Sequence, residues 1–161
     1  MDSTDAPTFQ IILAEDNPGD VTVVRMALRD AGVNCELRVL HDGAQAIAFL
    51  DAIDADPKVM PVIDLLLLDM HLPEHDGEDI LKCLRSTENF AQTRVIVMTA
   101  SEAPRDYANA ERHAAMHFFR KPTTLAEFMQ LGVIVRDLLG PKKPAELESS
   151  GARTKEQGGK A

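Results

Sequence analysis

The amino-acid sequence predicts an α/β protein with a doubly wound, five-stranded parallel sheet. Five short apolar segments alternate along the chain with five segments of helical spacing, which is typical of a parallel sheet covered by helices. Residues 65–68 are four consecutive leucines, as expected for a central strand buried on both faces. The chain has 161 residues, of which 45 % are hydrophobic, and this is enough for one domain with a substantial core.

The leucine run is interpreted as a strand because prolines limit it on both sides. Pro61 and Pro73 leave too little room for a helix across this run. The strand places Asp69 at its carboxyl end, where open α/β sheets bind ligands. Taken alone, Asp69 fits a turn residue or a helix cap equally well.

The first strand–helix unit starts with an apolar strand at residues 11–14 that ends at Glu15 and Asp16. Asn17-Pro18 then predicts a helix N-cap followed by proline at the first helical position. Gly32 is expected to end this helix. Its apolar stripe is Val21, Val24, Leu28 and Ala31.

The second unit pairs a strand at Cys35–Leu40, which has weak alternation, with a helix capped at Asp42-Gly43. The stripe of this helix is Ile47, Leu50 and Ile53. Residues 54–61 are polar and carry two prolines, so a loop is predicted before the leucine strand.

The remaining units complete the alternation. A third helix follows Asp76-Gly77, and strands are predicted at 94–98 and 116–120. The helix at 104–113 has a poor apolar stripe, so we expect it to be the least buried. The third helix carries Ile80, Leu81 and Leu84, and the last helix carries Leu125, Phe128, Gly132, Val135 and Leu139.

Right-handed crossovers between these units give the flavodoxin-like topology. We divide the chain into an N-terminal extension at 1–8, one domain at 9–140 and a tail at 141–161. The tail is rich in Pro, Lys, Gly, Ser and Glu and has almost no bulky apolar residue, so it is expected to be disordered.

Composition excludes several classes of function. A net charge of −9 is the wrong sign for a general phosphate-backbone binder, and aromatic residues at 4 % provide few stacking surfaces for nucleic acid. No signal peptide or membrane-spanning run is found. Cys35 and Cys83 match no metal or redox spacing and are interpreted as small buried hydrophobic residues. A cytoplasmic location is predicted.

Polar residues follow four of the five predicted strands. Because parallel strands point the same way, Glu15, Asp16, Asp69, Thr99 and Lys121 are expected to meet at one edge of the sheet. Three carboxylates so close repel one another unless a cation intervenes, and Mg²⁺ prefers such oxygen ligands. The cluster therefore predicts a magnesium site in which Asp69 acts as a nucleophile toward phosphorus, with Mg²⁺, Lys121 and Thr99 neutralising the phosphoryl oxygens.

The motifs ILAEDN, LLLLDMHLPEHDG, VIVMTAS and FFRKP resemble the receiver domain of two-component response regulators, over about residues 9–139. The resemblance implies that Asp69 is the phospho-acceptor and that Asp16 binds Mg²⁺ directly, while Glu15 assists through water. It also implies that the backbone carbonyl of His71 is a metal ligand and that the Lys121-Pro122 bond is cis.

The same resemblance assigns Thr99 and Phe118 to a conformational switch. Two residues, His71 and Phe118, depart from the family pattern. His71 stands where Asn is usual, so the turnover of the acyl phosphate is expected to be unusual. Phe118 stands where Tyr is common, and it can pack but cannot donate a hydrogen bond.

The segment ILAEDNPGD is similar to stand-alone receivers that are partnered with bacterial phytochrome kinases. The predicted function is therefore a single-domain response regulator that takes a phosphoryl group from a histidine kinase. It would act on an unknown downstream protein, without direct binding to DNA or a membrane. Apart from Mg²⁺-dependent self-phosphorylation and slow self-dephosphorylation, it is not expected to be an enzyme. A homodimer is expected through the fourth helix, fifth strand and fifth helix.

Two other functions compete with this interpretation. A phosphatase with an aspartyl nucleophile is one, although the haloacid-dehalogenase pattern needs a second aspartate where His71 stands. A pseudo-receiver that is never phosphorylated is the other, and the intact set of acidic, hydroxyl and lysine residues argues against it.

Overall fold

A computed structural model describes residues 7–56, 58 and 62–141 of the chain. The strands are β1 (Phe9–Ala14), β2 (Cys35–Leu40), β3 (Leu65–Asp69), β4 (Arg94–Thr99) and β5 (His117–Arg120). The helices are α1 (Pro18–Asp30), α2 (Gly43–Ala55), α3 (Gly77–Arg85), the 3₁₀ turn η1 (Glu88–Phe90), α4 (Pro104–Arg112), α5 (Leu125–Phe128) and α6 (Gln130–Leu139).

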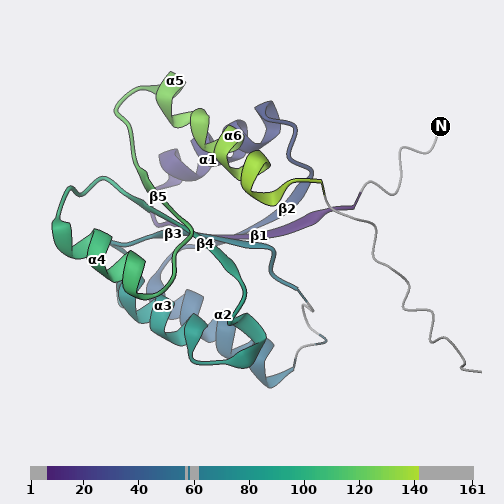
Figure 1. Cartoon of the computed structure of the whole chain (residues 1–161), viewed down its shortest axis with the longest axis vertical. Coiled ribbons are helices and arrows are strands. Elements are labelled where there is room, and N and C mark those ends of the chain that lie inside the picture. The colour runs from purple at the N-terminus through teal and green to yellow at the C-terminus, as the bar shows by residue number, and fades with distance from the viewer. Residues whose placement is uncertain (1–6, 57, 59–61, 142–161) are drawn as a thin grey trace, which may run out of the picture.

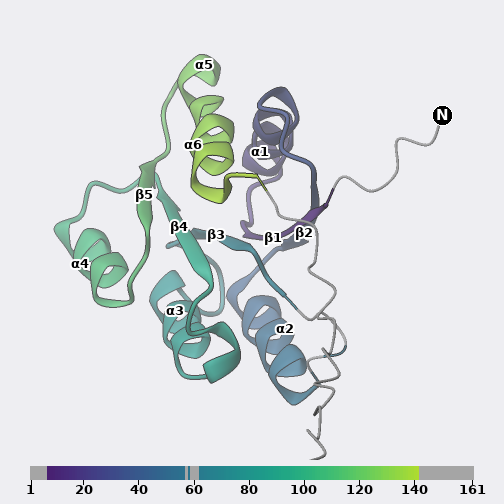
Figure 2. The same ribbon diagram turned by 45° about the vertical axis from the view of Figure 1, so that its right-hand side comes forward.

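The strands form one parallel sheet in the order β2-β1-β3-β4-β5. Helices α1 and α6 cover one face, and α2 and α3 cover the other, as Figures 1 and 2 show. The predicted doubly wound, five-stranded parallel fold is confirmed. Strand order reverses its direction of growth between β1 and β3, which places a crevice at their carboxyl ends.

Polar caps start the helices directly after the strands. The Asn17 side chain accepts hydrogen bonds from the backbone N–H groups of Gly19 and Asp20, and Asp42 accepts one from Gln45. These bonds satisfy N–H groups that have no partner inside a helix. The predicted caps at Asn17 and Asp42 are confirmed, and they fix where each helix leaves the edge of the sheet.

Strand β3 is buried along its whole length because helices lie on both of its faces. Leu66 and Leu68 belong to the core on the α2–α3 side, whereas Leu65 and Leu67 belong to the core on the α1–α6 side. Burying each of these leucines contributes about 2 kcal/mol. This strand is therefore a rigid support for Asp69, its last residue.

The last helix differs from the prediction in one respect. It is divided into α5 and α6 at Met129, which keeps a helical backbone with φ −61° and ψ −20°. Phe128 and Val135 are buried as predicted, but Leu125 is 54 % exposed, so its assignment to the apolar stripe is wrong. The reason is position, because α5 extends beyond the sheet and leaves its first turn without a core to contact (Figure 2).

Helix α4 has the weak apolar stripe that the sequence predicted. Its buried residues are Asp106, Asn109 and Ala110, of which only one is apolar. The Tyr107 ring stacks on Phe118 of β5 with ring centroids 3.8 Å apart. Polar contacts and one aromatic pair therefore attach this helix to the domain.

The predicted disordered tail and N-terminal extension fall largely on residues 1–6 and 142–161, which lie outside the described residues. Among the described helices, none combines the length and apolar character needed to cross a membrane. Cys35 and Cys83 are free thiols, and each is half-buried rather than buried as predicted.

The contact between α1 and α6 gives a prediction for Gly132→Ala. A Cβ at this position would lie 2.0 Å from the Ala27 carbonyl oxygen, so the two helices must separate. We expect a loss of about 2 kcal/mol in the free energy of unfolding, measured by urea titration. Gln130→Ala, at an exposed site of the same helix, should change it by less than about 0.5 kcal/mol. Equal stability of the two variants would contradict this close approach.

Candidate functional site

The carboxyl edge of the sheet collects the five residues that the sequence singled out. Glu15 and Asp16 follow β1, Asp69 ends β3, Thr99 ends β4 and Lys121 follows β5. The backbone ladder continues into the site and fixes these residues. The Glu15 N–H donates to the Leu40 carbonyl, and the Lys121 N–H donates to the Thr99 carbonyl.

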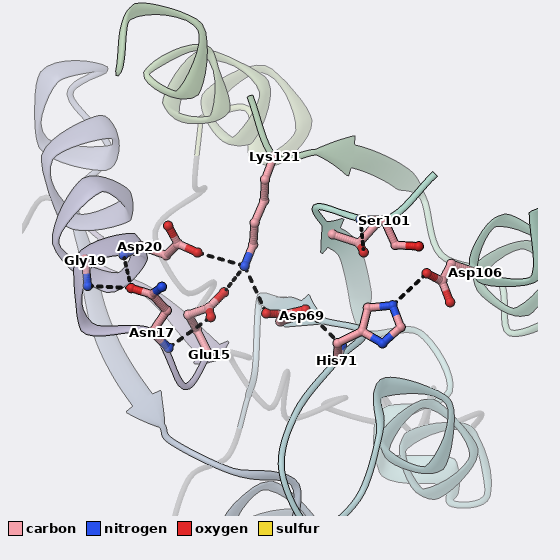
Figure 3. A network of polar contacts seen from close by, with 10 residues as sticks. Glu15, Asn17, Gly19, Asp20, Asp69, His71, Ser101, Asp106 and Lys121 are labelled. Carbon is pink, nitrogen blue, oxygen red and sulfur yellow. Dashed lines mark hydrogen bonds and ion pairs between the residues drawn. The ribbon is translucent and has the colours of Figure 1, made fainter. Parts of the chain in front are cut away.

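The centre of the site is the Lys121 ammonium, which is surrounded by three carboxylates (Figure 3). Its Nζ lies 2.7 Å from Glu15 Oε2, 2.9 Å from Asp20 Oδ2 and 2.9 Å from Asp69 Oδ2. The Lys121 side chain is only 10 % exposed. One cation therefore faces three carboxylates in a largely dehydrated setting, which leaves a net negative charge.

The pKa values reflect this imbalance. Burial raises the pKa of Glu15 from its ordinary 4.5 to about 7, and the nearby Asp69 charge adds to the rise while hydrogen bonding to Lys121 opposes it. For Lys121, burial alone would lower the pKa, but the hydrogen bonds to Glu15, Asp20 and Asp69 raise it above its ordinary value. The lysine is therefore always positively charged, and Glu15 is the carboxylate whose pKa is raised.

Both oxygens of Asp69 accept hydrogen bonds. Oδ2 accepts from Lys121, and Oδ1 accepts from the backbone N–H of His71 at 2.9 Å. Asp69 is buried on the last position of the rigid strand β3, so its carboxylate is held in one orientation. A carboxylate fixed in this way is prepared to act as a nucleophile.

Three carboxylates have the arrangement of a cation site. Ligand oxygens of Glu15, Asp16 and Asp69 all lie within 4.8 Å of one another. Glu15 and Asp69 are buried, whereas Asp16 is exposed, so the cluster is open to solvent on one side. Oxygen donors with room for water suit Mg²⁺. Burial is the main cause of the raised pKa of Glu15, and a divalent cation would relieve the repulsion by Asp69 that adds to it.

Thr99 and Phe118 lie on neighbouring strands, β4 and β5. Thr99 is fully buried, and its Oγ1 accepts a hydrogen bond from the Ser101 N–H at 3.0 Å, so the hydroxyl proton remains available to donate. Phe118 is half-buried and stacks on Tyr107 of α4. The structure thus places one predicted switch residue in the site and the other against α4, and their role stays a prediction.

The predicted cis bond at Lys121-Pro122 is contradicted, because no peptide bond between described residues is cis. The trans form is the favoured isomer of a peptide bond before proline. Lys121 reaches all three carboxylates with the trans bond, so a cis bond is not needed to direct its side chain into the site.

Sequence reasoning missed two acidic residues. Asp20 binds Lys121 from the first turn of α1, and the signal was available, because a helix that follows β1 starts at this edge of the sheet. Asp106 binds the His71 ring from α4, with 2.8 Å between His71 Nε2 and Asp106 Oδ2. No sequence pattern indicated this pair, because the two residues are 35 positions apart.

Comparison with known proteins identifies a family. The sequence profile described as the response regulator receiver domain matches residues 11–131. The transcriptional regulatory protein TrcR of Mycobacterium tuberculosis is 32 % identical over 143 residues, which are 88 % of this chain but 51 % of TrcR. The response regulator Rcp1 of Synechocystis is 32 % identical over 114 residues, which are 70 % of this chain and 77 % of Rcp1. The chain thus spans about half of TrcR and about three quarters of Rcp1.

Solved structures agree with this result. The phosphorylated cyanobacterial phytochrome response regulator RcpA superposes with a TM-score of 0.74 at 25 % identity, over 83 % of this chain and 94 % of RcpA. The Mn²⁺-bound form of Rcp1 superposes with a TM-score of 0.74 at 26 % identity, over 86 % of this chain and 99 % of Rcp1. The resemblance to receivers linked to phytochromes, suggested by the ILAEDNPGD segment, is confirmed.

The charge balance gives a prediction for Lys121→Met in metal-free buffer. Removing the ammonium leaves Glu15, Asp20 and Asp69 facing one another, so we expect a loss of about 3 kcal/mol in the free energy of unfolding at pH 8. The loss should be smaller at pH 5.5. Because the pKa of Glu15 is raised to about 7 in the folded protein, its carboxylate takes up a proton below that pH and one negative charge disappears.

Lys82→Met is the matched control, because Lys82 is exposed and pairs only weakly with Glu78. Chemical denaturation at both pH values measures the effect. If Lys121→Met lowers the free energy of unfolding equally at both pH values, the three carboxylates do not repel one another as proposed.

Proposed function

This chain belongs to the response regulator receiver family, and we propose on that basis that it accepts a phosphoryl group from a histidine kinase onto Asp69 in an Mg²⁺-dependent reaction. The observation that carries the proposal is the Asp69 carboxylate at the end of β3, held between Lys121 Nζ and the His71 N–H beside two further acidic residues. Signalling would follow from a change at the protein surface.

Asp69 is proposed as the nucleophile. One of its carboxylate oxygens forms the new bond to phosphorus as the phosphorus–nitrogen bond of the phosphohistidine donor breaks. Lys121 already contacts Asp69 Oδ2, so its ammonium stands next to the incoming charge. Thr99 is buried at the end of the neighbouring strand, and its hydroxyl provides a donor for a second phosphoryl oxygen.

The acidic cluster is proposed to hold Mg²⁺. Asp16 and Asp69 would be direct ligands together with the backbone carbonyl of His71, and Glu15 would act through water. The bound cation would neutralise charge on the phosphoryl oxygens. The donor set supports this proposal, since three carboxylates lie together and the pKa of Glu15 is raised to about 7 by burial and by Asp69. A manganese-bound form is known for the relative Rcp1.

We propose a bacterial phytochrome as the histidine kinase. Support comes from the similarity to Rcp1 and to the phytochrome response regulator RcpA. The domain would work in the cytoplasm and pass its signal to a protein partner, without contacting DNA. Its own chemistry would be limited to self-phosphorylation and slow loss of the phosphoryl group.

A homodimer through α4, β5 and α5 is proposed as the signalling assembly. Tyr107 and Met116 are large apolar residues that are exposed on this side of the domain. Phe118, the predicted switch residue, lies under Tyr107, so a change at Phe118 would reach the same surface. Phosphorylation would strengthen the dimer to the extent that the phosphorylated site favours the conformation that dimerises.

Acetyl phosphate tests the acceptor. With Mg²⁺ present, the wild-type protein should gain the mass of one phosphoryl group, and Asp69→Asn should gain none because the nucleophilic oxygen is lost. Chelation of Mg²⁺ should abolish the gain in the wild type. Asp79→Asn, at an exposed carboxylate of α3, is the control and should be phosphorylated normally. Stable phosphorylation of Asp69→Asn would show that the acceptor is misassigned.

Sedimentation velocity at micromolar concentration, with and without beryllofluoride, tests the dimer. Beryllofluoride should increase the dimer fraction several-fold. Met116→Asp should reduce it, because a charge would replace an exposed apolar contact. Met26→Asp, at an exposed methionine of α1, should have no effect. A monomer in both states would exclude the dimer, and dissociation caused by Met26→Asp alone would move the interface to α1.

A further inference from the structure

One side-chain hydrogen bond joins the loop after Asp69 to α4. His71 Nε2 lies 2.8 Å from Asp106 Oδ2. An ionised carboxylate can only accept, so the imidazole nitrogen must donate the hydrogen. The bond crosses a cleft that is lined by Met70 and His71 on one side and by Asp106 and Asn109 on the other.

The two partners of this bond are buried to very different degrees. The Asp106 side chain is 8 % exposed, whereas the His71 side chain is 60 % exposed. Within the described part of the chain, no side chain other than His71 is hydrogen-bonded to the Asp106 carboxylate. The helix dipole stabilises an acidic residue in the first turn of a helix. An exposed residue gains the same stabilisation, so the dipole does not explain why Asp106 is buried. A buried carboxylate without a donor is costly, so Asp106 holds the ring in place.

His71 also contacts the acceptor, through its backbone. Its N–H donates to Asp69 Oδ1 at 2.9 Å. Figure 3 shows the ring directed from this point toward α4 and away from the Asp69 carboxylate. The same residue thus contacts the acceptor with its main chain and α4 with its side chain.

The other end of α4 is attached independently of the acceptor site. Arg85 Nε donates to the His113 carbonyl at 3.0 Å, just after the last turn of α4. Ala110 is the apolar residue that α4 buries, and it lies in the second half of the helix. The first turn therefore depends on Asp106 for its contact with the acceptor loop.

We propose that Asp106 is a positioning residue for the acceptor site, which keeps the His71 imidazole on α4 and away from any group bound to Asp69. The inference rests on the proposed function of Asp69. Rotation of the His71 side chain would bring its Nε2–H to a group on Asp69, but one N–H cannot serve that group and Asp106 at the same time. Occupancy of Asp69 and attachment of the first turn of α4 thus compete for one donor.

Competition of this kind is reciprocal. If a group on Asp69 weakens the His71–Asp106 bond, then loss of that bond must strengthen binding of the group by the same factor. The first turn of α4 would loosen when Asp69 is occupied, since Asp106 would then need water as its donor. This link is separate from the predicted switch at Thr99 and Phe118, because it starts at the acceptor loop.

The affinity for beryllofluoride, measured by ¹⁹F NMR at pH 8 with saturating Mg²⁺, tests the proposal. Asp106→Ala should bind about threefold to tenfold more tightly than the wild type. Asp106→Asn keeps an acceptor oxygen and should bind like the wild type. Glu111→Ala, at an exposed position of α4, is the matched control and should also be unchanged. His71→Asn and the double variant His71→Asn/Asp106→Ala should bind equally, because both lack the imidazole that Asp106 holds and both carry the same asparagine amide.

Hydrogen exchange of residues 104–112 provides a second measurement. Beryllofluoride should accelerate exchange of the Tyr107 and Ala108 amides, whose hydrogen bonds close the first turn of the wild-type helix. In free His71→Asn, whose change lies at an exposed side chain, the same amides should already exchange fast. Unchanged affinity of Asp106→Ala, or an equal gain in the His71→Asn background, would overturn the positioning role while leaving Asp69 as the acceptor. Failure of the wild type to bind beryllofluoride would overturn the proposed function and this inference together.

Discussion

A single buried ammonium partly neutralises three carboxylates at the carboxyl edge of the sheet, and the rest of the site depends on it. Lys121 follows β5, and it contacts carboxylates at the ends of β1 and β3 and in the first turn of α1, none of which is paired with β5 in the sheet. The balance is incomplete, because three anions surround one cation. Burial and the Asp69 charge raise the pKa of Glu15 to about 7, and the site therefore attracts further positive charge.

The rigid part of the molecule is held by apolar packing, whereas the adjustable part is held mainly by polar contacts. The sheet and the helices α1, α2, α3 and α6 bury continuous apolar clusters, which pack at high density and resist movement. Helix α4 is held by a histidine–aspartate bond, a hydrogen bond from the Arg85 side chain to the His113 carbonyl and one aromatic stack. Contacts of this type open at lower cost than an apolar core, so α4 is the element best suited to respond to the site.

His71, two residues after the acceptor Asp69, connects the rigid part to α4. His71 belongs by its backbone to the rigid edge, where its N–H orients Asp69, and by its side chain to α4. An asparagine at this position is shorter and would not span the same gap to Asp106 in the same way. This chain therefore differs from the family pattern at His71, and it also has Asp106 on α4, which binds the imidazole.

The sequence by itself determined the strands, the helix caps at Asn17 and Asp42, and the meeting of Glu15, Asp16, Asp69, Thr99 and Lys121. These follow from local rules, since apolar runs define buried strands and parallel strands end at one edge. Tertiary structure alone decided which acids Lys121 contacts, the trans bond before Pro122, the exposure of Leu125 and the His71–Asp106 pair. Each of these depends on the position of one helix or loop relative to the sheet, and packing between distant segments sets that position.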